Sequence, residues 1–264
     1  IALEDRPEID RWVLSKLHSL ISDVDAAYNE YEPTKAGRAI QDFVTEQLSN
    51  WYVRLCRRRF WKNDDPTDKL AAYQTLYTCL ETVSILASPI APFFMDQLFQ
   101  DLNAVSGKHQ EESVHLALFP KVNQHFIDKS LESQMELAQK SCSLVLGLRK
   151  KHMLRVRQPL QKVMIPVLDK KTEEQILAVS ELIKQEVNVK ELQLINAEEA
   201  SHLIVKQIKP NFKALGPRFG KDMGLISKEI QSFGQEQINE LDSKGSLDIV
   251  INGKSITLAL DDVE

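Results

Sequence analysis

The first hundred residues carry apolar side chains at spacings of three and four, interrupted by prolines and short polar runs. This period places the apolar side chains on one stripe of an α-helix, and such a stripe is stable only when it packs against other helices. Pro33, Pro66 and Pro89 mark breaks in the pattern, because proline cannot continue a helix. The pattern therefore predicts an antiparallel four-helix bundle with short loops, with helices at 9–31, 34–61, 70–87 and 93–102.

Some finer expectations accompany the bundle. Thr34 is predicted to cap the second helix, which would be about 40 Å long if it continues to Trp61. Residues 103–112 are polar and expected to be mobile, whereas 113–120 reads as an extended segment that lies on the bundle.

After the bundle the pattern changes twice. A long helix near 128–156 is expected to end before Pro159, because proline disfavours a helical conformation in the preceding residue. Strand-like and helical segments then alternate, and Asn252-Gly253 is a strong signal for a two-residue hairpin. The expected strands and helices are 163–168, 172–186, 189–195, 203–208, 220–233, 235–241, 247–251 and 255–260. The fold class is therefore mainly α with a smaller α+β domain, and the expected domains are 1–122, 123–160 and 161–264.

The charge distribution favours a polyanionic partner more than the net charge of −5 suggests. Three stretches, 51–62, 149–157 and 206–221, contain several cations and no acid, and local clusters set the field that a polyanion meets. The sequence contains no apolar run of membrane-spanning length and no signal-peptide pattern. Its three cysteines have no metal or redox spacing and are typical of a reduced cytosolic protein.

The stretch from Trp51 to Lys62 is the first candidate site. At helical spacing, Asn50, Arg54, Arg57 and Trp61 fall on one stripe, which offers cations to phosphates and a flat ring to an unstacked base. Val44, Leu48, Trp51 and Leu55 fall on a neighbouring stripe that is expected to be core. A polyanion partner accounts for the cluster of arginines better than complementation of the helix dipole does.

Each residue in this stretch has a structural alternative. Trp51 is more often core than base platform at such spacing. Arg58 is also a candidate RNA contact, but its helical angle brings it near the core face, where it could pair with an acid. Trp61 could pack rather than stack on a base, and Asn50 could cap neighbouring backbone rather than read a base edge.

A second candidate surface lies in the third basic stretch. Pro210, Gly216, Pro217 and Gly220 bend the backbone there, which predicts a shaped loop before a helix and a possible phosphate or base clamp. The alternative is a structural turn with exposed lysines. The residues expected to contact RNA are Lys209, Asn211, Lys213, Arg218 and Lys221. In the middle stretch, Arg149, Lys150, Lys151, Arg155 and Arg157 could extend the RNA tract or bind another part of a larger enzyme.

Several motifs resemble one family. Residues 10–17 (DRWVLSKL) resemble the entry helix of the anticodon-binding domain of class I aminoacyl-tRNA synthetases, and 88–93 (SPIAPF) is similar to a turn of the same bundle. Residues 48–55 (LSNWYVRL) with 57–61 (RRRFW) look like the isoleucyl branch, as do 155–160, 186–190 and 209–221. The segment 113–116 with Phe119-Pro120 also matches.

The resemblance implies a helical bundle of the anticodon-binding type and a partner, the tRNA isoacceptors for isoleucine. A valyl or leucyl relative is the alternative within the family, and a helical protein-interaction module with basic docking faces is the alternative outside it. The sequence starts at Ile1 and contains neither His-Ile-Gly-His nor Lys-Met-Ser-Lys-Ser. We therefore expect part of a longer cytoplasmic ligase that has no catalytic residue here, with the catalytic domain as a partner in cis. No cofactor or metal is expected in this chain, since ATP and Mg²⁺ belong to the catalytic domain.

Overall fold

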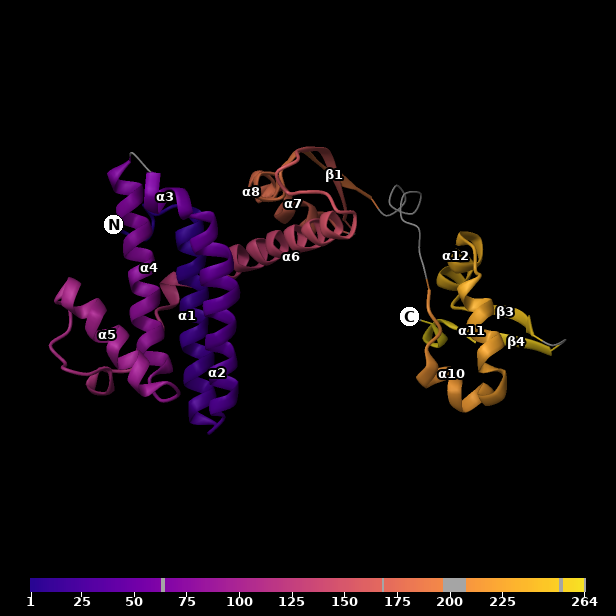
Figure 1. The fold of residues 1–264 in the computed structure, drawn as a ribbon, viewed down its shortest axis with the longest axis horizontal. Coiled ribbons are helices and arrows are strands. Elements are labelled where there is room, and N and C mark those ends of the chain that lie inside the picture. The colour runs from indigo at the N-terminus through magenta and orange to yellow at the C-terminus, as the bar shows by residue number, and fades with distance from the viewer. Residues whose placement is uncertain (63–64, 168, 197–207, 252–253, 264) are drawn as a thin grey trace. The chain divides into compact units, whose positions relative to one another are not determined.

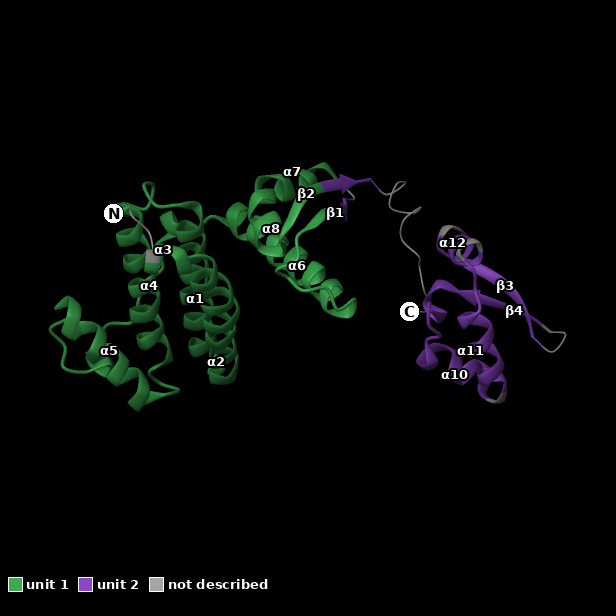
Figure 2. Cartoon of the chain, turned by 45° about the horizontal axis from the view of Figure 1, so that its top comes forward, with its two compact units in different colours: residues 1–163, 169–192 green, residues 164–168, 193–264 purple. Residues whose placement is uncertain are grey.

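The computed structural model describes residues 1–62, 65–167, 169–196, 208–251 and 254–263. The chain divides into two compact units (Figure 2). Unit 1 comprises residues 1–163 and 169–192, and unit 2 comprises residues 164–168 and 193–264. The predicted mainly α fold with a smaller α+β part is confirmed, and each unit is described by itself below.

Unit 1 contains a bundle of helices, in which α1 packs against α2 and α4 (Figure 1). Its core includes fully buried side chains of the first helix, such as Trp12, Leu17 and Val24. The second helix begins at Pro33, preceded by Glu32 without a side-chain cap, so the prediction that Thr34 is the cap was wrong. The elements of the bundle are α1 (Glu8–Asn29), α2 (Pro33–Asp42), η1 (Phe43–Val53), α3 (Arg57–Lys62), α4 (Pro66–Ala87) and α5 (Pro92–Ser106).

The predicted second helix is not one regular α-helix. Its middle, η1, is a π-helix, and a turn at Cys56 separates it from α3. A π-helix closes its hydrogen bonds over five residues rather than four, so it advances by a smaller angle per residue. Consecutive side chains therefore stay closer to one face, and the neighbours Trp51 and Tyr52 are both buried.

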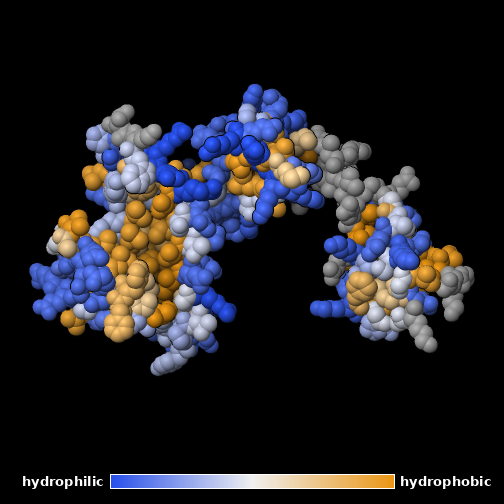
Figure 3. All heavy atoms as spheres, viewed as in Figure 1, coloured by the Kyte–Doolittle hydropathy of each residue, from blue (hydrophilic) through white to orange (hydrophobic). Residues whose placement is uncertain are grey.

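Polar contacts attach the segment after α4 and α5 to the bundle. Buried Glu81 accepts hydrogen bonds from Lys108 Nζ (2.5 Å) and pairs with His109 Nε2 (2.6 Å). The predicted extended segment contains a short 3-10 helix, η2 (Val114–Leu116), and Val114 packs against Phe99. The same bundle carries an apolar groove between α2, η1, α4 and α5, and Figure 3 shows apolar side chains gathered along the bundle.

The long helix α6 (Lys129–Lys151) follows η3 (Gln124–Phe126) and is fixed to α1 by one carboxylate. Glu132 accepts hydrogen bonds from Ser15 Oγ (2.6 Å) and Ser19 Oγ (2.8 Å), and also from Lys129 Nζ (3.0 Å). The helix ends earlier than predicted because the guanidinium of Arg149 donates hydrogen bonds to three carbonyls of the chain that folds back. These carbonyls belong to residues 155, 158 and 188.

A short β-α-α-β segment follows α6, with β1 (Leu160–Pro166), α7 (Lys170–Ala178), α8 (Ser180–Val187) and β2 (Val189–Ile195). The two strands pair with each other. Their flanking hydrogen bonds, Leu160 N to Asn188 O and Val167 N to Ile195 O, advance along both strands in the same direction, as in a parallel pair. The predicted helix 172–186 is thus two helices. Both pack on α6 in unit 1, so this unit extends beyond residue 160.

Unit 2 consists of α10 (Phe212–Phe219), η4 (Gly220–Asp222), α11 (Met223–Gln231), α12 (Gln235–Lys244), β3 (Ser246–Ile251), β4 (Lys254–Ala259) and η5 (Leu260–Asp262). The helices bury Leu215, Ile226 and Ile230 against the predicted hairpin, whose strands pair antiparallel with Ile251 opposite Lys254. The predicted strand 203–208, apart from Ile208, and the predicted Asn252-Gly253 turn lie outside the described residues.

The shaped loop predicted at 209–221 was wrong, because most of it is the helix α10. Asn211 caps this helix by accepting hydrogen bonds from Lys213 N and Ala214 N. Pro217 lies inside the helix, where it removes one intrahelical hydrogen bond. A helix of eight residues with a good cap and a buried Leu215 accommodates that loss.

Candidate nucleic-acid interface

The basic end of the second predicted helix lines a groove of about 1140 Å³ within unit 1. One wall comes from the C-terminal part of η1 and from α3, and the other from α8 and the residue after it. We call it the α3–α8 groove, and its lining residues are Arg54, Leu55, Arg57, Arg58, Trp61, Leu182, Gln185, Glu186 and Asn188. The four residues of this stretch that are candidates for RNA contact, Arg54, Arg57, Arg58 and Trp61, therefore line one cavity.

Two arginines of α3 are available to a ligand. Arg57 and Arg58 are exposed, and neither has a hydrogen-bond or ion-pair partner within the part of the chain that the structure describes. Trp61 is 75% exposed, so its indole presents a free aromatic face. The structural alternative for Arg58, in which it pairs with an acid near the core, was wrong.

Arg59, and not Arg58, is the arginine that pairs with an acid near the core. Its guanidinium donates hydrogen bonds to both carboxylate oxygens of Asp10 (2.6 and 2.9 Å) and pairs with Asp68 (2.7 Å). Asp10 is fully buried and also accepts a hydrogen bond from the hydroxyl of Tyr52 (2.9 Å). Burial opposes the charged form of Arg59, but the hydrogen bonds to Asp10 and Asp68 outweigh it and raise its pKa. The turn at Cys56 shifts α3 in register, so a constant angle of 100° per residue assigns these two arginines to the wrong faces.

Arg54 joins the bundle to α8. Its Nε donates a hydrogen bond to Asn50 O (2.8 Å), and its Nη1 forms an ion pair with Glu186. The guanidinium also lies 5.7 Å from the centre of the Trp51 ring, a distance at which the cation and the aromatic face attract each other. Arg54 is therefore held in place by three contacts before any ligand binds.

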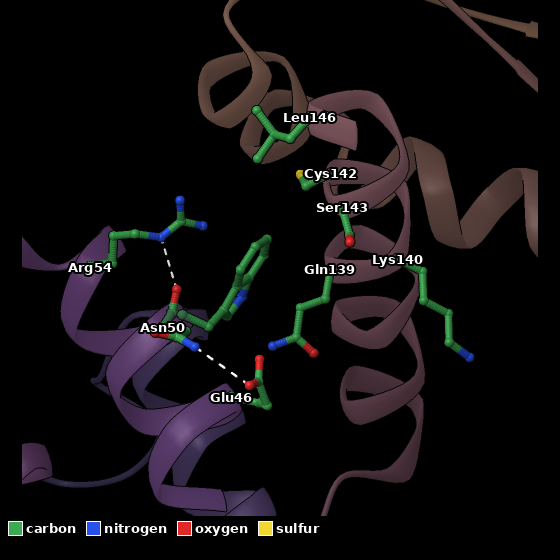
Figure 4. A pocket seen from close by; sticks show the side chains of 9 residues that line it. Glu46, Asn50, Arg54, Gln139, Lys140, Cys142, Ser143 and Leu146 are labelled. Carbon is green, nitrogen blue, oxygen red and sulfur yellow. Dashed lines mark hydrogen bonds between the residues drawn. The ribbon is translucent and has the colours of Figure 1, made fainter. Parts of the chain in front are cut away.

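A second groove lies on the other side of Arg54, between η1 and α6 (Figure 4). Asn50 lines this groove and donates a hydrogen bond to Glu46 (3.5 Å). Trp51 is also part of its lining and is 4% exposed, which confirms its predicted core role. The predicted stripe is thus divided, with Asn50 on the η1–α6 side and Arg57 and Trp61 on the α3–α8 side.

The middle basic stretch is also divided. Arg149 is 2% exposed and binds backbone carbonyls, so the expectation that it extends an RNA tract was wrong. Its neighbours Lys150 and Lys151, together with Arg155 and Arg157, are exposed.

In unit 2, two of the predicted RNA contacts hold the fold together. Asn211 caps α10 and donates a hydrogen bond to Asp261 O (3.1 Å). Arg218 binds both carboxylate oxygens of buried Asp262 at 2.7 Å. Lys209 and Lys213 are exposed, while the side chain of Lys221 lies outside what the structure describes.

The described residues include no cluster of three His, Cys, Asp or Glu side chains that could hold a metal ion. In the same part of the chain, every helix is too short or too polar to cross a membrane. Chemically, the exposed groups of the α3–α8 groove are the unpaired guanidinium groups of Arg57 and Arg58, the paired guanidinium of Arg54, an indole and an amide. These are groups that bind phosphates and stack on bases.

Comparison with known proteins decides the family. Residues 10–165, more than half of the chain, match the model of the anticodon-binding domain of tRNA ligase. The chain belongs to this family.

Proteins similar to this anticodon-binding chain over nearly all of its length bear the name isoleucine–tRNA ligase. The chain is 51% identical to the protein from Bacteroides fragilis and 53% identical to that from Cytophaga hutchinsonii, each over 100% of the chain. It is 36% identical to the Thermus thermophilus protein over 98% of the chain. The matches cover 23%, 24% and 25% of those three proteins, so the chain spans about a quarter of the length of these relatives.

Proposed function

We propose that this chain binds the anticodon stem and loop of isoleucine tRNA and thereby positions the tRNA for aminoacylation by a catalytic domain in cis. The observation that carries the proposal is the α3–α8 groove, in which Arg57, Arg58 and Trp61 have exposed side chains. The two unpaired guanidinium groups offer charge-assisted hydrogen bonds to phosphates, and the indole offers a platform for one unstacked base. Membership in the anticodon-binding family and the names of the relatives support the same ligand.

In this proposal the nine candidate residues have different roles. Arg57, Arg58 and Trp61 contact RNA directly, and Arg54 contributes from its fixed position between the two grooves. Lys209 and Lys213 are exposed cations that add affinity from unit 2, whereas Asn211 and Arg218 shape α10 and its surroundings. Lys221 remains a candidate on the basis of its sequence position alone.

The proposal extends to the longer ligase. The catalytic domain would supply ATP-dependent aminoacylation with Mg²⁺, and this chain would contribute no catalytic residue. The location would be the cytoplasm, which agrees with three free cysteines, all buried. A valyl or leucyl identity is less well supported, because the relatives that align with the whole chain are named isoleucine–tRNA ligase.

The test is binding of the 264-residue chain to transcripts of isoleucine tRNA, measured by filter binding at several salt concentrations. Each lost contact to a single-stranded phosphate lowers the slope of log K against log salt by about 0.7, so Arg57→Ala with Arg58→Ala should lower it by about 1.4. Trp61→Ala should weaken binding by about 1–3 kcal/mol if the indole stacks on a base. An anticodon-swapped transcript should bind more weakly than the native one.

Arg38→Ala is the matched control, because Arg38 is an exposed arginine of α2 that does not line the groove and has no partner among the described residues. It should leave both the affinity and the salt slope unchanged. If the double variant of Arg57 and Arg58 binds like the Arg38 variant, the groove is not the RNA site. Equal binding of native and anticodon-swapped transcripts would refute recognition of the anticodon.

A further inference from the structure

We propose that Glu186 determines base specificity in the α3–α8 groove by accepting hydrogen bonds from a nucleobase that carries an exocyclic amino group. This inference rests on the proposed RNA-binding function and assigns a role that the cationic residues cannot supply. Glu186 is the only acidic residue among the nine described residues that line the groove. A carboxylate repels phosphate, so its presence beside three arginines calls for a different ligand group.

The structure holds this carboxylate in a fixed position. Glu186 lies in the last turn of α8, where its neighbours Ile183 and Val187 are buried and fix the rotation of the helix. Its Oε1 pairs with Nη1 of Arg54, and its side chain is only 13% exposed. The carboxylate is therefore ordered before a ligand arrives, which reduces the entropy lost on binding.

The carboxylate also keeps unused acceptor capacity. An ionised carboxylate has about four lone-pair sites, and Arg54 is the sole partner of Glu186 among the residues that the structure describes. The amide of the adjacent Gln185 is exposed on the same wall and likewise has no partner there. A base that enters the groove thus meets free acceptors on the wall opposite the cations.

These groups together select a class of base. Trp61 can stack on any base, and Arg57 and Arg58 can bind any phosphate, so they do not distinguish one sequence from another. Glutamate accepts hydrogen bonds from amino groups such as N4 of cytosine, and adenine and guanine also carry exocyclic amino groups. Uracil has none. Glu186 should therefore favour an amino-bearing base over uracil at one unpaired position of the loop.

The alternative role for Glu186 is that of a brace, which only holds Arg54 and so keeps α8 against the bundle. The two roles differ in one observable. A brace supports binding of every RNA equally, whereas a base-reading carboxylate makes affinity depend on the base at one position.

The experiment measures fluorescence anisotropy of the 264-residue chain with anticodon stem-loops that differ at a single unpaired base. One good base contact discriminates by about 1–3 kcal/mol, so the native chain should prefer an amino-bearing base over uracil by about fivefold to 150-fold at one position. Glu186→Gln should reduce this preference to about twofold or less. Where the preferred base is guanine, replacing guanosine by inosine, which lacks the exocyclic amino group, should lower the affinity of the native chain by a similar factor. This test requires no protein variant.

Two control variants separate base reading from bracing. Glu181→Gln makes the same change on α8 at an exposed residue that pairs with Lys184 and does not line the groove, so the preference should persist. Arg54→Met breaks the ion pair but keeps the carboxylate, so affinity should fall for all stem-loops while the preference remains.

The outcomes also distinguish this inference from the function on which it rests. The role of Glu186 is overturned if the Glu186 variant keeps its base preference. It is also overturned if the Arg54 variant loses as much base preference as the Glu186 variant does. Salt-dependent binding without base preference at any loop position overturns it as well and leaves the proposed RNA binding intact. Absence of salt-dependent binding to every stem-loop refutes the proposed function itself.

Discussion

Replacement of Arg59 by alanine should destabilise unit 1 severely, although this arginine lies in the most basic stretch of the chain. The change would leave Asp10, which is fully buried, without the two hydrogen bonds that compensate its charge. Removing one partner of a buried ion pair costs about 3–5 kcal/mol. The exposed neighbour Arg58 has no partner within the described residues, so Arg58→Ala should change stability by no more than about 0.5 kcal/mol.

Urea unfolding followed by tryptophan fluorescence measures this difference. All three tryptophans, Trp12, Trp51 and Trp61, belong to unit 1, so the signal reports on that unit. With a typical urea slope of about 2 kcal/mol per molar, a loss of about 3–5 kcal/mol lowers the midpoint by about 1.5–2.5 M. Asp10→Asn should also lower it, because the variant removes the partner of the guanidinium. Equal midpoints for the variants of Arg59 and Arg58 would show that Arg59 does not anchor the buried Asp10.

Two further predictions concern titratable groups of unit 1. Burial raises the pKa of Glu132, but the hydrogen bonds from Ser15 and Ser19 and the contacts with Lys129 outweigh it, so the pKa lies below its ordinary value. Its stabilising effect is therefore complete above the unfolded-state pKa of about 4.3 and is lost as the pH falls through the lower folded-state pKa. Glu132→Gln should accordingly flatten the acid limb of a plot of urea midpoint against pH, whereas parallel curves would contradict this. Burial raises the pKa of Cys56 to about 11 and that of Cys142 to about 12, so a thiol reagent at pH 8 should react with the three cysteines only after unfolding. Rapid reaction of the folded chain with the reagent would show that at least one thiol is accessible and reactive.

The sequence predicted the fold well where one local signal and the packing agree. The apolar period of α1 matches the side chains that the bundle buries, and α4 begins at Pro66, one of the prolines that mark breaks in the pattern. In the first turns of α4 the match is poorer, because Leu70 and Tyr73 are about half exposed. In unit 2, the alternating residues on both sides of the hairpin turn suffice to predict β3 and β4. In each case neighbouring residues carry the information.

The site was less predictable because it depends on contacts between distant residues. Whether Arg58 or Arg59 reaches Asp10 depends on the turn at Cys56, and no local propensity reveals that turn. Glu186 was noted only as part of a family motif, because its place opposite α3 follows from the packing of α8 on α6. Arg149 looked like part of a basic tract, yet the carbonyls that surround it come from residues up to 39 positions away.

The length of the π-helical segment η1 determines which side chains of α3 face the groove and which face the core. Each residue of η1 turns the chain by somewhat less than the roughly 100° of an α-helix, so adding or deleting one residue between Phe43 and Val53 would rotate α3 about its axis by that smaller angle. Such a change would exchange the anchoring arginine with its exposed neighbours while leaving the composition of the basic end intact. Relatives that differ in length within this segment would therefore present different arginines to the groove, even where the letters of the basic stretch are the same.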